Sequence, residues 1–437
     1  MTVRGISSIQ KILSIFIILT IAATPLILSL STTSSADYVE TQNSELKKWT
    51  LMFYDDADFD RGVDVFNCHY FGKNYLKGFS DEAFSSENLN VLALQDNYTS
   101  NRSTIWYIGE NHEKNPLEVY GEINMGNYTT LRDFIMYSKT NYPAERYILL
   151  VYNHGGAWKG CCWDYNYPEQ TDSFPDFLTM DEMRQALVEA DGVDCICFTA
   201  PCLMASLEAA YEIRDCTDIY IGSEEGSMYL YWYNSIEDLC ELLNNDPDIP
   251  VIALGKEIIS LVENNFKSSL WHISKIFYKI RIIPRIKYVL NVRGVFTMSA
   301  IRTDELQNVS ISIDKFADNL TDILSKNHFK IKLAKSLTES FGHGLVCDIY
   351  DFADKCSMLF KSSNNSIYNS AEAVKHNISE TVIANTHGFS RPRANGVNIF
   401  FPSKLIKSIG GYAGYLQADL DFLRDTSWDE FLEAYFS

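Results

Sequence analysis

The stretch RYILLVYNHGG, residues 146–156, is a run of apolar residues that ends in an asparagine, a histidine and two glycines. An apolar run without polar alternation is typical of a strand that is buried on both faces, as in a parallel sheet. Other runs of this kind occur at residues 49–56, 90–95, 103–109, 194–200, 219–225, 295–301 and 396–402. Together they predict the strands of a large buried sheet.

Stretches with the periodicity of amphipathic helices lie between these runs, at residues 129–141, 179–190, 203–215 and 310–327. Buried strands that alternate with such helices predict an α/β fold, in which helices cover both faces of a mostly parallel central sheet. We expect a core over residues 45–270 and a C-terminal subdomain over residues 271–437.

A basic run, residues 275–293, supports a division near residue 270, because it carries six cations and no acid in an acidic chain. Acidic neighbours could neutralise this run, or it could face anionic lipid headgroups or form a processing loop. The sequence leaves these interpretations open.

The chain carries 57 acidic and 37 basic residues, which gives a formal net charge of −20 at pH 7. A surface with this charge repels the phosphate backbone of nucleic acids. We therefore expect no nucleic-acid partner.

The N-terminus has the pattern of a targeting segment. Arg4 and Lys11 precede an uncharged apolar stretch, residues 12–30, and small polar residues follow it. A positive start before an apolar stretch is typical of a secretory signal, and the length of the stretch also suits a retained membrane anchor. We expect residues 1–36 to be one or the other. The rest of the chain would then lie outside the cytoplasm or on the cell surface, with the membrane contacted only through this segment.

Ten cysteines fit an exported protein, because disulfides persist outside the cytoplasm. Their irregular spacing leaves the pairing undefined, and the absence of a Cys-x-x-Cys pair from the sequence argues against a zinc ribbon.

Two reactive side chains follow predicted strands. His154 follows the strand that ends at Asn153, and Cys202 follows the strand 194–200 after a proline. Ligands bind at the carboxyl ends of strands in open α/β sheets, and a nearby base activates a thiol. A helix that begins just after Cys202 would favour the thiolate, and Gly155 would let a backbone N–H approach an oxyanion. A structural histidine and a packed or disulfide-bonded cysteine are the alternatives.

Several stretches, in order, resemble the clostripain family of cysteine peptidases, family C11. They are WTLMFYDDADFD (49–60), GEINMGNYTTLRDFI (121–135), YPAERYILLVYNHGGAWKG (142–160), PCLMASLEAAYEIRD (201–215) and ANGVNIFFP (394–402). The resemblance implies a caspase-like three-layer α/β/α sandwich. It places the catalytic pair of the family on His154 and Cys202.

The resemblance also implies a reaction. Cys202 would attack a peptide carbonyl to form a thioester, and His154 would serve as general acid and base. The oxyanion would bind to the backbone N–H groups of Gly155 and Cys202. An enzyme of this kind would be a secreted or surface-anchored endopeptidase that acts on protein or peptide substrates. We expect it to need no cofactor and to be a monomer.

The sequence departs from the family at Ala200, where the family usually carries the aspartate that holds a basic P1 side chain. Ser223, Glu224 and Glu225, after the next predicted strand, could line the substrate pocket instead. The alternative is that the two glutamates are solvated loop acids. The loss of the aspartate also leaves a second hypothesis, a non-catalytic caspase-like binding protein at the cell surface.

Two further family features are possible by resemblance alone. Some members use calcium, and DDADFDRG (55–62) superficially resembles a calcium loop, but Arg61 stands where the glycine of that loop belongs. We therefore predict no metal site. Some members cleave themselves after the histidine, and the segment 158–177 is a long stretch in which this could occur.

Overall fold

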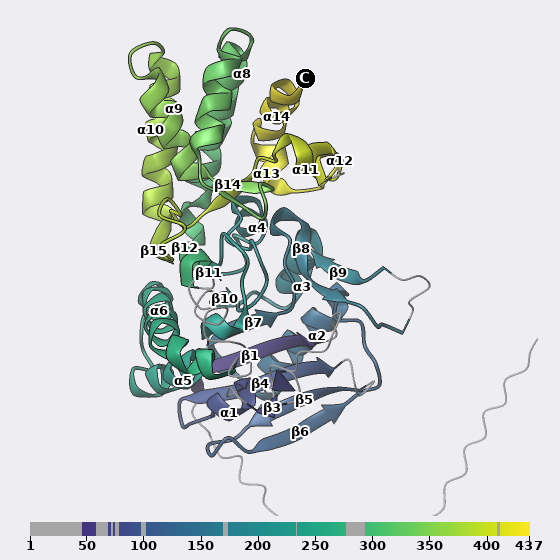
Figure 1. Cartoon of the computed structure of the whole chain (residues 1–437). Coiled ribbons are helices and arrows are strands. Elements are labelled where there is room, and N and C mark those ends of the chain that lie inside the picture. The colour runs from purple at the N-terminus through teal and green to yellow at the C-terminus, as the bar shows by residue number, and fades with distance from the viewer. Residues whose placement is uncertain are drawn as a thin grey trace, which may run out of the picture. The chain divides into compact units, whose positions relative to one another are not determined.

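The structure is a computed structural model. It describes residues 46–57, 69–70, 73–74, 78–97, 102–168, 174–232, 234–276, 293–408 and 411–437 (Figure 1). Residues 46–437 form one compact unit. The predicted targeting segment 1–36 lies outside the described residues, as do Cys68, residues 58–62 and most of the basic run.

A nine-stranded sheet forms the centre of the described structure, in the order β15-β12-β11-β10-β7-β1-β4-β5-β6. Its five central strands are parallel: β11 (Ile219–Gly222), β10 (Cys195–Phe198), β7 (Ala144–Tyr152), β1 (Lys47–Ala57) and β4 (Leu89–Asn97). Antiparallel strands extend both edges, namely β12 (Thr297–Arg302), β15 (Val382–His387), β5 (Arg102–Ile108) and β6 (Lys114–Val119). This arrangement confirms the predicted mostly parallel sheet.

Both faces of the central strands are buried, which explains their uninterrupted apolar sequences. In β1, Met52 and Tyr54 point into one hydrophobic core, while Leu51 and Phe53 point into a second core on the opposite face. Because side chains alternate between the two faces of a strand, a strand between two cores needs an apolar residue at nearly every position.

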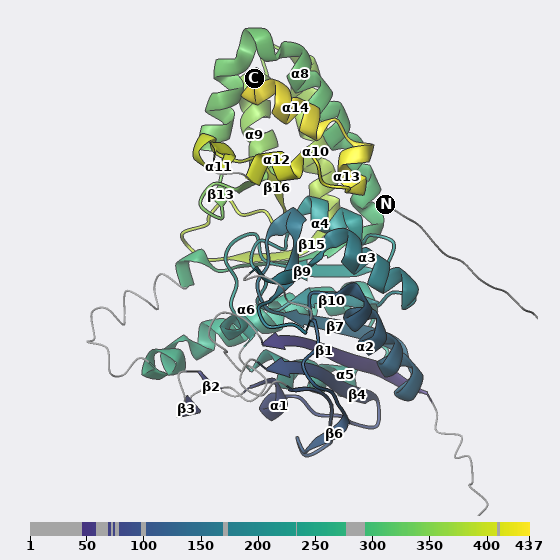
Figure 2. The same cartoon turned by 90° about the vertical axis from the view of Figure 1, so that its right-hand side faces the viewer.

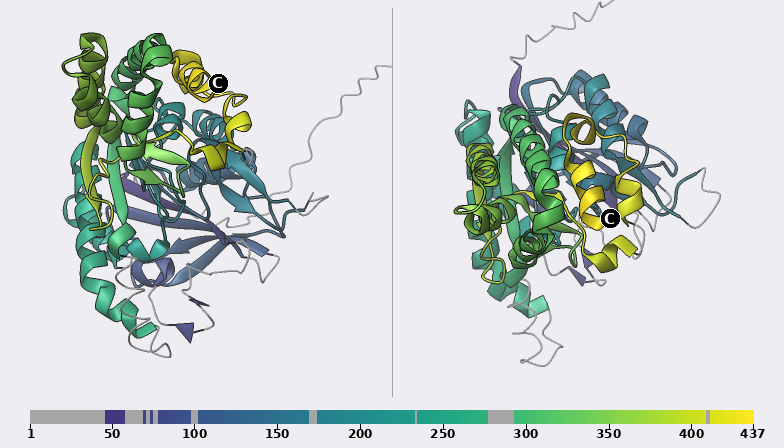
Figure 3. Two further views of the ribbon diagram at one scale, coloured as in Figure 1. Left: turned by 45° about the horizontal axis from the view of Figure 1, so that its top comes forward. Right: turned by 90° about the horizontal axis from the view of Figure 1, so that it is seen from above.

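Helices form the two outer layers (Figures 1 and 3). The core with Leu51 contains residues of α1 (Phe79–Glu82), α5 (Ser235–Asn245) and α6 (Val251–Ile276). The core with Met52 contains residues of α2 (Tyr128–Asn141), α3 (Met180–Glu189), α4 (Leu207–Glu212) and α8 (Leu306–Leu337). The predicted three-layer α/β/α sandwich is therefore confirmed.

The C-terminal part of the chain adds a small sheet and more helices. The sheet has the order β13 (Ser340–Phe341), β14 (Val346–Asp348), β16 (Asn398–Phe400). The helices α9 (Ile349–Phe360) and α10 (Asn365–Thr381) pack against α8, as does α14 (Trp428–Phe436) (Figure 2). Because β12 and β15 belong to the large sheet, that sheet contains residues from both sides of position 270. The division into a core and a C-terminal subdomain stays a prediction.

The remaining elements are short. They are β2 (His69–Tyr70), β3 (Lys73–Asn74), β8 (Gly160–Asp164), β9 (Asp176–Thr179), α11 (Lys404–Ser408), α12 (Gly411–Tyr415), α13 (Asp421–Asp425) and three 3-10 turns at Ala157–Lys159, Tyr229–Trp232 and Thr303–Glu305. Among the described residues, no helix is both long enough and apolar enough to cross a membrane.

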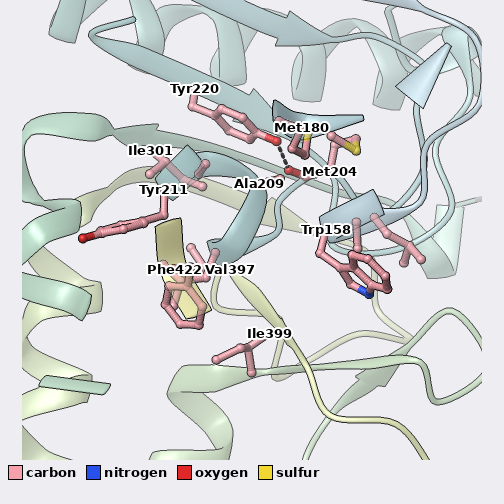
Figure 4. Close-up of a cluster of buried hydrophobic side chains, with 14 of the residues drawn as sticks. Trp158, Met180, Met204, Ala209, Tyr211, Tyr220, Ile301, Val397, Ile399 and Phe422 are labelled. Carbon is pink, nitrogen blue, oxygen red and sulfur yellow. Dashed lines mark hydrogen bonds between the residues drawn. The ribbon is translucent and has the colours of Figure 1, made fainter. Parts of the chain in front are cut away.

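The apolar core that contains Met52 extends under the segment after Cys202 (Figure 4). The hydroxyl of Tyr220, on β11, donates a 2.5 Å hydrogen bond to the carbonyl of Met204. Trp158, Ile399 and Phe422 belong to the same core and come from distant parts of the sequence. The segment after the cysteine therefore rests on packed side chains from both halves of the chain.

The central strand β7 should dominate the stability of the sheet. Leu149 is fully buried in it, so Leu149→Ala should lower the free energy of unfolding by about 2–5 kcal/mol through lost burial and a cavity. Urea unfolding followed by circular dichroism measures this effect. Val119→Ala is the control, because Val119 is 58% exposed and its loss should change stability by less than about 0.5 kcal/mol. Equal effects of the two substitutions would contradict this account of the core.

Candidate active site

The structure brings the two predicted reactive residues to the same edge of the sheet. Strands β7 and β10 are parallel neighbours, with Val151 opposite Phe198. His154 and Cys202 follow these two residues by only three and four positions. The two strands are therefore neighbours, as a His154–Cys202 pair requires, while the catalytic roles of the two side chains stay predictions.

Gly155 brings the backbone after β7 against the backbone of Cys202. A Cβ atom at this position would lie 2.6 Å from the carbonyl oxygen of Cys202 and 2.9 Å from its nitrogen. Real Cβ atoms do not approach backbone this closely, so only glycine lets the two backbones meet. The glycine after the histidine is therefore required by packing against the cysteine.

Asn153 fixes the backbone from which His154 projects. Its φ of 149° is uncommon for a residue other than glycine, and its side chain supplies the compensating contacts. The Asn153 Nδ2 donates to the carbonyls of Asp56 (2.9 Å) and Trp163 (3.3 Å), and its Oδ1 accepts the N–H groups of Trp163 (3.0 Å) and His154. His154 itself is exposed.

Strand β8 closes the histidine loop from the other side. Cys162 N–H donates to the carbonyl of His154 at 3.1 Å, and Gly156 N–H donates to that of Gly160 at 2.9 Å. Cys161 and Cys162 are buried here, with their sulfurs 3.7 Å apart. The nine cysteines of the described residues are all free thiols, Cys202 among them.

The sulfur of Cys202 lies beside the loop after β11. The Ser227 N–H donates to the Cys202 Sγ at 3.3 Å, and the Ser227 carbonyl lies 3.8 Å from it. Burial raises the pKa of the Cys202 thiol above its ordinary value; the Ser227 hydrogen bond lowers this pKa, and the negative charge of Glu225 raises it. A thiol in this setting needs a base to become a nucleophile.

The helix predicted to begin just after Cys202 begins later, so that prediction was wrong. Helix α4 starts at Leu207 with Ser206 as its N-cap. The intervening residues form a turn, in which Leu203 has a φ of 65°, because their N–H groups bond elsewhere. Leu203 donates to the carbonyl of Glu225 (3.0 Å) and Ala205 donates to that of Ser223 (2.9 Å). The backbone donor at the thiol is therefore Ser227, and not the N-terminus of a helix.

Asn398 is a supporting residue that the sequence analysis missed. Its side-chain Nδ2 donates to the carbonyls of Leu203 (3.1 Å) and Glu224 (3.3 Å), and its backbone N–H donates to that of Ala205 (2.7 Å). It thereby ties the cysteine loop to the loop after β11. The sequence did carry a signal for this role, because Asn398 is a polar residue within an otherwise apolar run, residues 396–402. In the structure its side chain is buried.

The predicted substrate-binding residues occupy three kinds of position. Ala200 is buried in an apolar cluster. Ser223 and Glu224 are also buried: the Ser223 Oγ lies 2.7 Å from the Thr297 hydroxyl, and the Glu224 Oε2 accepts the N–H of Gly396 at 2.8 Å. Burial, together with neighbouring Asp348, raises the pKa of Glu224 well above its ordinary value.

Glu225 lies nearer the surface and is ion-paired with Arg391. The interpretation of both glutamates as solvated loop acids does not fit, since Glu224 is 1% exposed and Glu225 is paired. A role of Ala200 or of these residues in substrate binding stays a prediction.

Within the parts of the chain that the structure describes, no group of three or more His, Cys, Asp or Glu residues is placed to hold a metal ion. Asp55 and Asp56 are buried at the end of β1, but most of the segment that resembles a calcium loop lies outside the described residues.

Comparison with known proteins places the chain in a family. Residues 62–435 match the model of the clostripain family, a family of C11 peptidases. Clostripain from Hathewaya histolytica is 30% identical over 206 residues, which cover 40% of this chain and 38% of that protein. The aligned region thus spans less than half the length of this curated relative.

Two solved structures share the fold. A secreted C11 cysteine protease from Bacteroides thetaiotaomicron, in complex with an irreversible peptide inhibitor, superposes with a TM-score of 0.58 at 15% identity and covers 88% of this chain and 100% of that one. An inactive zymogen C11 protease from Parabacteroides distasonis gives a TM-score of 0.55 at 18% identity over 87% of this chain and 98% of that one. These likenesses confirm the caspase-like fold, and the family model, which covers most of the sequence, shows that the chain belongs to the clostripain family of cysteine peptidases.

Proposed function

We propose that this chain is a cysteine endopeptidase that hydrolyses peptide bonds in protein or peptide substrates, with Cys202 as its nucleophile and His154 as its general acid and base. The observation that carries the proposal is the placement of both residues at the ends of two adjacent parallel strands, β7 and β10. Membership of the clostripain family supports the same reaction.

In the proposed reaction, the His154 imidazole takes the proton of the Cys202 thiol, and the thiolate attacks the substrate carbonyl. The tetrahedral intermediate collapses to a thioester as the His154 imidazolium protonates the leaving amine. His154 then removes a proton from water, which hydrolyses the thioester and returns the free thiol. Nucleophile and acid–base group both belong to the chain, so this acyl transfer needs no cofactor.

The backbone N–H groups of Gly155 and Cys202 are the proposed oxyanion donors. Their strands bring the two backbones together, because Gly155 has no Cβ to hold them apart. Donors fixed in place before the reaction stabilise a developing negative charge without reorganising. The hydrogen bond from Ser227 to the sulfur would in addition favour the thiolate over the thiol.

We further propose that the enzyme acts as a monomer outside the cytoplasm or on the cell surface, exported by the segment 1–36 as a cleaved signal or a retained anchor. The charge pattern of that segment supports export. So does the secreted C11 cysteine protease from Bacteroides thetaiotaomicron that shares the fold.

Labelling with peptide acyloxymethyl ketones that carry basic, acidic or neutral P1 residues tests the reaction. We expect labelling of the wild-type chain at Cys202, no labelling of Cys202→Ala, and a loss of at least about 100-fold in labelling and hydrolysis rates for His154→Ala, because the thiol would lack its base. Cys216→Ala is the control, since this buried cysteine lies away from the strand end. If no P1 residue gives labelling that depends on Cys202, the peptidase proposal fails and the non-catalytic hypothesis takes its place.

The substitution Ala200→Asp tests how the site selects P1. A carboxylate at this position should raise kcat/KM for substrates with Lys or Arg at P1 by about tenfold relative to neutral P1. The reason is that a hydrogen bond between a carboxylate and a cationic P1 side chain is stronger than one between neutral groups. Ala200→Asn is the matched control, since it has the same shape without the charge. A peptide library read out by mass spectrometry measures the ratio. Equal ratios for the Asp and Asn variants would show that position 200 does not contact P1.

A further inference from the structure

An ion pair lies behind the nucleophile, on the side of the loop after β11. Glu225 is two residues before Ser227, whose N–H donates to the Cys202 sulfur, and its own carbonyl accepts the N–H of Leu203. Glu225 is thus hydrogen-bonded to the residue after Cys202 and lies two residues before the group that donates to its sulfur. Its carboxylate is also close enough to Cys202 to oppose ionisation of the thiol.

Arg391 meets this carboxylate from the C-terminal part of the chain. Its Nη2 pairs with the Glu225 Oε2, and its Nη1 donates to the Glu339 Oε1 at 3.1 Å and to the Ser340 carbonyl at 3.2 Å. The guanidinium carbon lies 5.3 Å from the centre of the Phe341 ring. Arg391 is therefore held from several sides while it faces Glu225.

The other Glu225 oxygen is held as well. Oε1 accepts the N–H of Gly226 at 3.0 Å and that of Gly342 at 3.2 Å. Glu225 is therefore a junction between the loop beside the nucleophile and the turn after β13. The two backbone N–H donors and the Arg391 guanidinium together fix the position of this carboxylate.

We propose that Arg391 is a positioning residue for the nucleophile: through its ion pair with Glu225 it holds the loop that carries the Ser227 N–H against the Cys202 sulfur, and it offsets the negative charge of Glu225 beside the thiol. The inference rests on the proposed function only where it concerns peptide hydrolysis. The effect of Arg391 on the reactivity of the Cys202 thiol does not require the enzyme to turn over a substrate.

The charged groups around Cys202 and Arg391 limit which other residues could change the ionisation of the thiol. Among the described residues, the charge that acts on the Cys202 thiol is that of Glu225, while His154 follows the neighbouring strand β7. Arg391 faces Glu225 and Glu339. The Glu339 Oε2 also lies 3.7 Å from the Nη2 of Arg393. Arg393 forms a second ion pair with Asp351, and Asp351 is paired with Lys355 as well.

Arg393 supplies a matched control in the same network. It contacts Glu339 as Arg391 does, but its partners are Glu339 and Asp351, and not Glu225. A purely structural role of the network would make Arg391→Gln and Arg393→Gln alike. A role through Glu225 would affect Cys202 in the first variant only.

The test is the pH dependence of Cys202 alkylation by iodoacetamide in the full chain, with the modified peptide quantified by mass spectrometry. We expect Arg391→Gln to move the alkylation profile to higher pH and to slow alkylation at pH 7 about threefold to tenfold, because the Glu225 charge is no longer offset. Glu225→Gln should move the profile to lower pH. The double variant should return close to the wild-type profile, and Arg393→Gln should leave it unchanged.

An unchanged profile in Arg391→Gln, or equal shifts in Arg391→Gln and Arg393→Gln, would overturn the inference. Circular dichroism identifies a variant that does not fold. If Arg391→Gln does not fold, the double variant is compared with Glu225→Gln: a profile at higher pH in the double variant supports the inference, and identical profiles overturn it. Failure of the peptidase proposal would appear instead as intact alkylation without hydrolysis, so the two outcomes are distinguishable.

Discussion

The contact on which the site depends is the meeting of two backbones, Gly155 against Cys202, at the ends of β7 and β10. It exists because the two strands are parallel and adjacent, so that their carboxyl ends reach the same edge. The contact leaves no room for a side chain. Because both faces of these strands are packed against separate hydrophobic cores, a slip of one residue would turn every apolar side chain toward the wrong core. Register and reactive geometry are therefore fixed by the same burial.

A second constraint comes from the buried backbone around the thiol. The residues after Cys202 form a turn before they form a helix, and the polar groups of a turn inside the protein need partners. The loop after β11 accepts the N–H groups of Leu203 and Ala205, and Asn398 of the C-terminal half donates to the carbonyls of the same two residues. The segment beyond residue 293 thus helps to hold Cys202 in place, although the residues proposed to react all precede residue 203.

This division explains what could be predicted from the sequence. The central strands and the residues at their ends were predictable, because burial on two faces leaves a local apolar pattern and because parallel strands share an edge. The start of the helix after Cys202 was not predictable, since Leu203 and Ala205 continue the helical periodicity of the residues that follow, but their N–H groups bond to the carbonyls of Glu225 and Ser223. The supporting roles of Asn398 and Arg391 depend on contacts over more than 160 residues of sequence. No local pattern encodes such contacts.

The same contacts bear on substrate preference. An acid holds a cationic P1 side chain only if its charge faces the substrate and is not already matched. Glu224 is buried, and its Oε2 is bonded to Gly396, while the charge of Glu225 is matched by Arg391. Either glutamate would have to break these contacts to hold a lysine or an arginine, and in the case of Glu225 that would also disturb the loop that donates to Cys202. In this chain, recruiting Glu225 for specificity would thus disturb the loop at Cys202, the proposed nucleophile. The acids after β11 therefore do not simply supply the P1 charge that Ala200 lacks.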